Sequence, residues 1–343
     1  MGQVPPDGGA PSGAVVSEAQ PHVSRETPSD GAKATPANVS RETTEKYHDT
    51  PIAAAAERAS QVLTKGMAGR LPRPVEPRII TVANQKGGVG KTTTSVNIAA
   101  ALALHGLGVL VIDLDPQGNA STALGIDHRD PEISSVYELL LGEITLAEAM
   151  QRSPAHERLF CVPATLDLAG AEIELVSMVA RETRLRNAID LETIRAHDID
   201  YVIIDCPPSL GLLTVNAMVA AREVLIPIQC EYYALEGVGQ LLSNIELVQA
   251  HLNKDLWVST VLLTMYDGRT KLADQVADEV RRHFGDKVLT TVIPRSVKVS
   301  EAPGFGMTII EYDPGSRGAM SYLDAGRELG MRASATRQED GTA

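Results

Sequence analysis

The stretch IITVANQKGGVGKTTT, residues 79–94, constrains the fold more than any other part of this 343-residue chain. An apolar run at residues 79–83 breaks into a glycine-rich loop, and a segment with helical character follows from Thr92. A strand, a glycine loop, Lys-Thr and a helix form the unit that cradles phosphate groups in nucleoside triphosphatases. The stretch therefore predicts a phosphate loop between a strand and a helix.

The residue types in this loop suit an anion. Gly87, Gly88 and Gly90 allow positive φ and bring backbone N–H groups close to a ligand, and the helix N-terminus adds partial positive charge. The Lys of such a loop reaches the β and γ phosphates, and the hydroxyl after it ligates Mg²⁺. We expect ATP and Mg²⁺ as ligands, with the nucleotide bound by Lys86, Gly87, Gly88, Val89, Gly90, Lys91, Thr92 and Thr93.

The loop departs from the common G-x-x-x-x-G-K-[ST] pattern. Gln85 stands where the pattern has its first Gly, and a second lysine, Lys86, precedes the glycines. A dinucleotide-binding fingerprint is the nearest alternative. That loop has no use for a Lys directly before a Thr, so the triphosphatase interpretation is favoured.

Composition supports a globular core next to an unusual N-terminus. Hydrophobic residues make up 43% of the chain and aromatic residues 3%, so the core must consist of aliphatic side chains. No apolar run is long enough to span a bilayer, and the N-terminus lacks the apolar region of a secretory signal. Three widely spaced cysteines form no zinc or disulfide pattern, which predicts reduced buried thiols. We expect a cytoplasmic protein.

Periodicity divides the chain into three parts. Residues 1–77 are rich in Pro, Ala, Gly, Ser and Thr, which predicts a mostly disordered tail with one weak helical patch at 52–65. Residues 78–330 alternate apolar strands with helices, which predicts an α/β fold with a mostly parallel sheet covered by helices on both faces. Residues 331–343 read as a frayed tail. We expect strands at 79–83, 109–113, 159–162, 201–205, 223–228, 258–265 and 288–293, and helices at 92–105, 166–189, 213–221, 235–252, 272–284 and 318–329.

Two further strands end in acidic residues. VLVIDLDPQGNAS places Asp113 and Asp115 at the end of one strand, and DYVIIDCPPSLG places Asp205 at the end of another. Ligands of open α/β sheets bind at the carboxyl ends of the strands. There an acid can support Mg²⁺ or orient the attacking water, although an ordinary solvated turn explains Asp113 and Asp115 equally well.

Three stretches in this order, NQKGGVGKTT, VIDLDPQGN and YVIIDCPPS, closely resemble the deviant Walker-A ATPases of the ParA/Soj chromosome-partitioning family. TMYDGRTKLADQV, VIPRSVKVSEAPGFG and EYDPGSRGAMSY are also similar to that family. The resemblance covers roughly residues 78–330 and implies a slow, Mg²⁺-dependent ATPase with a deviant Walker-A P-loop fold. It does not cover the tail.

The resemblance also implies roles. Lys86, Lys91 and Asp115 match catalytic positions of the family, with Lys86 reaching across an ATP-bound homodimer and Asp115 positioning water. Thr92, Asp113 and Asp205 match the metal site, with Asp113 as a companion of Asp115. The family binds DNA without sequence preference as an ATP dimer, and a ParB-type partner stimulates hydrolysis and releases it. A nucleoid-associated protein follows from this resemblance.

The DNA binding that the resemblance implies needs a cationic surface on this chain. The net charge of −13 argues against a basic protein as a whole, but screening keeps each charge local, within about 8–10 Å at physiological salt. The candidate residues are Arg269, Lys271, Arg295, Lys298 and Arg317. Acidic residues are interspersed among them, so a solvated charged surface is a serious alternative.

Three related functions are alternatives. A MinD-like membrane ATPase needs a basic amphipathic C-terminal helix, and MRASATRQEDGTA has no apolar face. An iron–sulfur ATPase needs cluster-ligating cysteines, and Cys206 and Cys230 do not have that spacing. An ATP-switched transcriptional regulator would carry an N-terminal helix-turn-helix, and the tail shows no such pattern.

The tail contains the pentapeptide VSRET twice, at residues 23–27 and 39–43. In the partitioning systems that the chain resembles, the ParB-type partner binds a palindrome with the core GTTTCACGTGAAAC. Translated in one frame, this core encodes Val-Ser-Arg-Glu-Thr. We therefore hypothesise that the gene carries two partner-binding sites inside its coding region. A peptide motif that docks a partner is the alternative.

Overall fold

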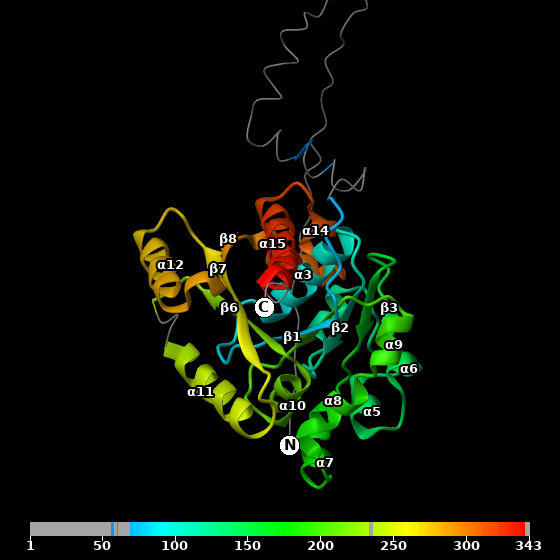
Figure 1. The fold of residues 1–343 in the computed structure, drawn as a ribbon. Coiled ribbons are helices and arrows are strands. Elements are labelled where there is room, and N and C mark those ends of the chain that lie inside the picture. Colours follow the sequence, from blue (N-terminus) through cyan, green and yellow to red (C-terminus); the bar gives the residue numbers. More distant parts are fainter. Residues whose placement is uncertain (1–55, 58–59, 61–68, 233–235, 340–343) are drawn as a thin grey trace, which may run out of the picture. The chain divides into compact units, whose positions relative to one another are not determined.

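The structure is a computed structural model that describes residues 56–57, 60, 69–232 and 236–339. A sheet of eight strands runs through these residues in the spatial order β3-β4-β2-β5-β1-β6-β7-β8 (Figure 1). Neighbouring strands pair in parallel, except that β3 is antiparallel to β4. The strands are β1 (Arg78–Val82), β2 (Val109–Asp113), β3 (Gln151–Arg152), β4 (Leu159–Val162), β5 (Tyr201–Asp205), β6 (Glu223–Gln229), β7 (Trp257–Tyr266) and β8 (Val288–Pro294).

Helices cover both faces of the sheet and bury two apolar cores. One core lies under α3 (Lys91–Leu104), α4 (Asn119–Ala123), α13 (Val297–Glu301), α14 (Ile309–Tyr312) and α15 (Arg317–Glu339). The other lies under α5 (Val136–Leu141), α6 (Leu146–Ala149), α7 (Leu168–Val176), α8 (Arg184–Ala188), α9 (Leu191–Ala196), α10 (Leu212–Ala220), α11 (Glu236–His251) and α12 (Lys271–Phe284). Short 3₁₀ turns are η1 (Arg181–Thr183), η2 (Gly285–Lys287) and η3 (Ala302–Phe305).

The fold confirms the predicted class and the seven predicted strands, with ends that shift by at most one residue. The central strands β2 and β5 are buried along their whole length, because helices cover both faces of a parallel sheet. The sequence did not predict β3, whose two residues are too short for any periodic signal. All three cysteines are buried and unpaired, which confirms the predicted state of the thiols.

One helix prediction was wrong, and another helix is longer than predicted. The helix expected at 166–189 is broken, because α7 ends at Val176 and the chain turns through Ala180, whose φ is 56°. The turn η1 and the short helix α8 follow. At the C-terminus, α15 continues to Glu339 and so occupies much of the segment expected to be frayed. The predicted tail up to residue 68, with its helical patch, lies largely outside the described residues, and the division into domains stays a prediction.

Strand order decides where a ligand can bind. β1 lies between β5 and β6, so the loop that leaves β1 meets the carboxyl ends of both neighbours. Asp113 of β2 pairs in register with Asp205 of β5, which brings the two predicted acidic strand ends together. Within the described residues, no helix has the length and apolar character to cross a membrane.

Candidate nucleotide site

The phosphate loop, residues 84–91, joins β1 to α3 in a conformation that requires glycine. Gly88 has φ of 75° and Gly90 has φ of 88°, both in the left-handed region. Gly87 and Gly88 are exposed, and a Cβ on either would meet open space, so a ligand has room above the loop. The loop is therefore shaped as the sequence predicts for phosphate binding.

Neighbouring strands hold this loop through hydrogen bonds that the sequence did not reveal. Thr264 of β7 donates its hydroxyl to the carbonyl oxygen of Val89 at 2.8 Å. Asn84 donates to the carbonyl oxygen of Pro227 in β6 at 2.8 Å and accepts from the Lys86 N–H at 3.0 Å. The loop is thus fixed before any ligand arrives, which lowers the entropic cost of binding.

Lys91 opens α3 with its side chain largely buried. Its residue is 7% exposed, and its Nζ donates to the carbonyl oxygen of Lys86 at 3.4 Å. Burial lowers the pKa of the Lys91 ammonium, while the nearby Asp205 raises it. A partly desolvated cation inside a glycine loop is suited to binding phosphate oxygens.

Asp205 lies fully buried at the end of β5, beside the first turn of α3. Its Oδ1 accepts from the Ser95 hydroxyl at 2.8 Å, and its buried Oδ2 has no hydrogen-bond partner. Burial raises the pKa of Asp205 to about 7, and the Asp113 charge adds to the shift, while the Thr92 and Ser95 hydroxyls lower it. A buried carboxylate oxygen without a donor fits a cation, so Mg²⁺ suits this position.

Asp113 has a different environment. Its Oδ2 accepts from both the N–H and the hydroxyl of Ser121, at 2.9 and 2.7 Å, and its Oδ1 accepts from the Asp115 N–H at 3.1 Å. Burial raises the pKa of Asp113 to about 6. These three donors make it a positioning residue for the turn that carries Asp115. Its role as a metal ligand stays a prediction.

Asp115 is partly exposed at the same edge of the sheet. Its Oδ1 accepts from the Gln117 N–H at 3.0 Å, and the turn closes at Gly118, whose φ is 63°. The acid is therefore held in a fixed turn next to the metal position, as water positioning would require. No group of three or more His, Cys, Asp or Glu in the described part of the chain could hold a metal alone. A Mg²⁺ ion here would need Thr92 and phosphate oxygens as well.

Lys86 makes an ion pair with Glu231, which follows β6. Its Nζ lies 3.6 Å from the Glu231 Oε2, and its side chain is 37% exposed. The sequence analysis did not single out Glu231. Because an exposed pair of this kind contributes at most about 1 kcal/mol, Lys86 can exchange this partner for a stronger anion.

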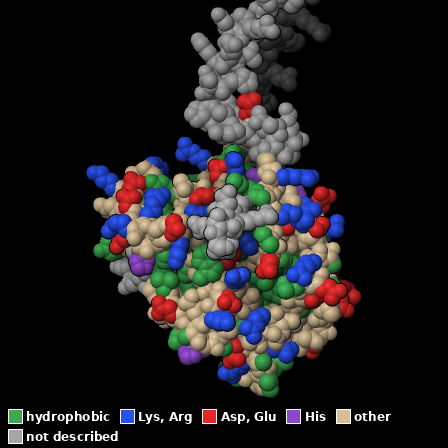
Figure 2. Space-filling model, in the orientation of Figure 1, with side chains coloured by type: hydrophobic (Ala, Val, Ile, Leu, Met, Phe, Trp, Pro, Cys, Tyr) green, Lys and Arg blue, Asp and Glu red, His purple; other side chains and the backbone are tan. Residues whose placement is uncertain are grey.

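The predicted DNA residues are all exposed and lie after β7 and β8 or at the starts of α12, α13 and α15. Arg269 pairs with Asp267 at 2.7 Å, and Lys298 pairs with Asp313. Figure 2 shows basic and acidic side chains interspersed over the displayed face. Each of the five residues is accessible to a ligand, and their contact with DNA stays a prediction.

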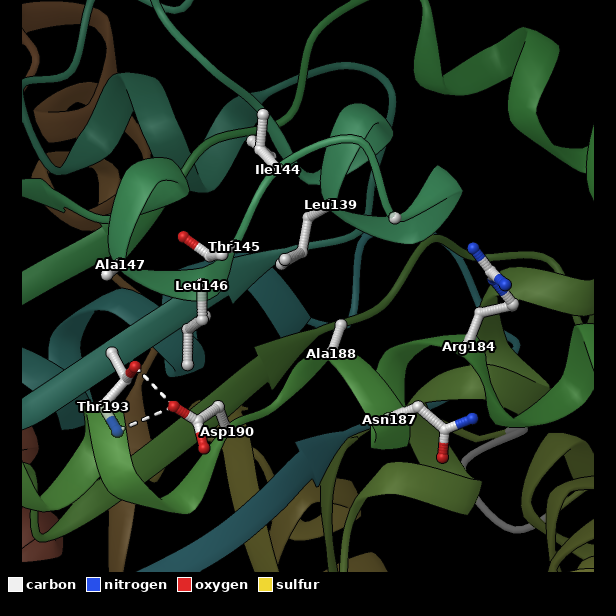
Figure 3. A pocket seen from close by; sticks show the side chains of 11 residues that line it. Leu139, Ile144, Thr145, Leu146, Ala147, Arg184, Asn187, Ala188, Asp190 and Thr193 are labelled. Atoms are coloured by element: carbon white, nitrogen blue, oxygen red, sulfur yellow. Dashed lines mark hydrogen bonds between the residues drawn. The ribbon is translucent and has the colours of Figure 1, made fainter.

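A separate hollow of about 630 Å³ lies among α5, α6, α8 and α9 and contains none of the predicted site residues (Figure 3). Its polar side chains already stabilise helix ends. Asp190 accepts from the Thr193 N–H and hydroxyl at the start of α9, and Arg184 donates to carbonyl oxygens at the end of α5. These groups offer a ligand little unused hydrogen-bonding capacity.

Comparison with known proteins agrees with this geometry. An AAA domain family matches residues 77–258. The chain is 55% identical over 252 residues to the sporulation initiation inhibitor protein Soj of Bacillus subtilis, covering 74% of this chain and 98% of that protein. It is 52% identical to the chromosome partitioning protein ParA of Myxococcus xanthus, covering 74% and 88%.

Solved structures extend the comparison to ligands. Cobyrinic acid a,c-diamide synthase from Mycobacterium smegmatis, with bound ADP and magnesium, is 40% identical with a TM-score of 0.62, covering 73% of this chain and 92% of that one. The cell division ATPase MinD of Pyrococcus furiosus is 27% identical with a TM-score of 0.59, covering 74% and 98%. A second structure of that synthase holds an ATP analog and magnesium. With its phosphate loop, its acidic strand ends and relatives above 50% identity, the chain belongs to the Soj/ParA family of chromosome-partitioning ATPases.

Proposed function

We propose that this chain is the ATP-driven switch of a chromosome-partitioning system. In the ATP state it is a homodimer that binds DNA without sequence preference, and hydrolysis stimulated by a ParB-type partner releases it. The observation that carries the proposal is the buried Asp205 Oδ2, which has no donor and lies beside a preformed phosphate loop. The cellular role in this proposal, chromosome partitioning, is taken from the names of the relatives.

The chain's own residues divide the chemistry. The backbone of the loop and Lys91 bind the phosphates, while Thr92 and Asp205 hold the metal. When bound, Mg²⁺ would neutralise phosphate charge and favour attack at the γ-phosphate. Asp115 orients the attacking water from its fixed turn, and Asp113 keeps that turn in place.

Dimerisation couples this site to DNA. A two-fold interface presents the same surface twice, so one Lys86 from each subunit completes the partner's site. It also places two copies of the cationic region on one assembly, and phosphate affinity grows with the number of contacts. DNA binding would therefore need ATP, because each subunit alone offers only the five candidate residues of that region. Association with the nucleoid follows.

Co-sedimentation with DNA tests the proposal. With Mg-ATP the protein should pellet with DNA of any sequence, and binding should fall steeply as salt rises. With ADP or without nucleotide it should stay in the supernatant. Asp115→Ala should bind DNA persistently, because it keeps ATP binding and loses water positioning, while Lys91→Ala should not bind. Equal affinity in the ADP and ATP states would rule out the switch.

A further inference from the structure

Helix α7 is apolar on two opposite sides. Its inner side buries Leu168, Ala171 and Leu175 completely in the core. Its outer side exposes Ala169, Ile173 and Val176, with exposed fractions of 79% for Ile173 and 58% for Val176, and Leu166 in the turn just before the helix is 73% exposed. We call these four residues the outer face of α7. Apolar side chains exposed side by side mark a surface that binds another protein.

The spacing of the outer face identifies the shape of its partner. Ala169, Ile173 and Val176 recur at intervals of four and three residues, which places them in one stripe along the helix, and Leu166 stands three residues before Ala169 in the preceding turn. Such a stripe packs against a second helix with the same spacing, as in a coiled coil. Figure 1 shows α7 at the periphery of the molecule, where another helix can reach it.

The charge around the stripe identifies the partner's chemistry. Residues 159–180 contain no Lys, Arg or His, and α7 and its N-cap carry Asp167, Glu172 and Glu174. The nearest basic residue, Arg181, donates to Glu182 and to the Val176 carbonyl oxygen. Packing α7 against its copy would bring two acidic sets together, which disfavours a second copy of this chain.

We propose that the outer face of α7 binds a basic amphipathic helix of a partner protein. Apolar residues of that helix cover the stripe, and its Lys or Arg residues face the three acids. Glu172, beside this face, lies against Gly211, where an added Cβ would come within 2.1 Å of its Oε1. Gly211 ends the turn that follows Asp205 and caps α10. This inference concerns a surface outside the nucleotide and DNA sites.

Fluorescence anisotropy with two synthetic helical peptides tests the proposal on the full chain. The probe peptide repeats Leu at heptad positions a and d and has Lys elsewhere, and the control peptide has Glu in place of Lys. The Lys peptide should bind and the Glu peptide should not. Ile173→Asp and Val176→Asp should each weaken binding about tenfold or more, because each buries a charge in place of an apolar side chain.

Leu247→Asp is the matched control, because Leu247 on α11 has the same 58% exposure as Val176 and the change adds the same charge. It should bind like the parent. Val176→Ser tests the apolar contact without added charge, and all variants should keep ATP binding, which shows that they are folded. Equal weakening in Leu247→Asp, equal binding of both peptides or no binding would overturn the proposal. If the parent chain associates with itself and Val176→Asp abolishes that association, the outer face of α7 binds a second copy of this chain and the proposal is wrong.

Discussion

Asp205 is the residue whose protonation matters most to this fold, because it is buried and its pKa is raised to about 7 from an ordinary 3.8. The folded chain holds this proton more tightly than the unfolded chain. The protonated form therefore stabilises the fold fully below pH 3.8, and this contribution is lost as pH rises through about 7. In the proposed site, a bound cation would take over the role of the proton when nucleotide is present.

Asp205→Asn should therefore melt higher than the parent at pH 8 without nucleotide, by roughly 3–8 °C. The Asn amide carries no charge, whereas the parent must bury a charged Asp205 at pH 8. The difference in melting temperature should shrink as pH falls toward 4, because Asp205 of the parent then becomes protonated and neutral. Scanning calorimetry across this range measures the effect, with the exposed Asp286→Asn as a control that should change little. With Mg-ATP the order should reverse, since the variant lacks the carboxylate that we propose as a cation ligand. A variant less stable than the parent at pH 8 without nucleotide would contradict this account.

Lys86 and Lys91 should separate dimerisation from nucleotide binding. Lys91→Ala should lose ATP binding, because its ammonium is buried inside the loop. Lys86→Ala should bind ATP in its own subunit and remain monomeric in sedimentation velocity, because its proposed target is the partner's nucleotide.

Glu231→Gln is the matched control, since it removes only the ion pair of Lys86 and should still dimerise with ATP. If Lys86→Ala dimerises normally with ATP, Lys86 has no role in the nucleotide site of the partner subunit.

At the scale of elements, packing determines which helices and strands the sequence pattern can predict. The apolar strands were predictable because β2 and β5 have no polar face to confuse their pattern. The break after α7 could not be predicted, because Met178 and Val179 continue the apolar pattern. Ala180 adopts a positive φ there although it is not Gly. In the site, the loop glycines and Asp205 were predictable from motif order. The hydrogen bonds of Thr264 to Val89 and of Ser95 to Asp205 could not be predicted, because they join residues that are far apart in the sequence and that only the fold brings together.

The packing of α3 on α15 gives a prediction at this scale. A Cβ on Gly326 of α15 would lie 2.6 Å from the Ala101 Cβ, so the two helices meet where only glycine fits. Gly326→Val should reduce the free energy of unfolding by about 1–3 kcal/mol. Gly239→Ala in α11, where a Cβ meets open space, should instead stabilise by up to about 1 kcal/mol. Denaturant unfolding of both variants measures this contrast, and a neutral Gly326→Val would mean that the helices can move apart.

At the scale of the whole molecule, the chain combines a region shared with its relatives and a long N-terminal extension. The match to Soj covers 74% of this chain and 98% of that protein, so the relative has almost no counterpart of the tail. The tail therefore lies outside the region that this chain shares with Soj. What the tail contributes must be sought in its own sequence, where VSRET stands twice.

The two copies predict a property of the gene. If the DNA spells GTTTCACGTGAAAC at both positions, the ParB-type partner should bind there, because this core encodes VSRET in one frame. Selection would then act on the DNA, which would explain why the two copies are identical. Sequencing the codons for residues 23–27 and 39–43 is the first measurement, and other codons would end the hypothesis. If the palindromes are present, synonymous recoding of both should abolish partner binding at this locus and leave the ATPase unchanged. Binding that survives recoding would instead point to the pentapeptide itself.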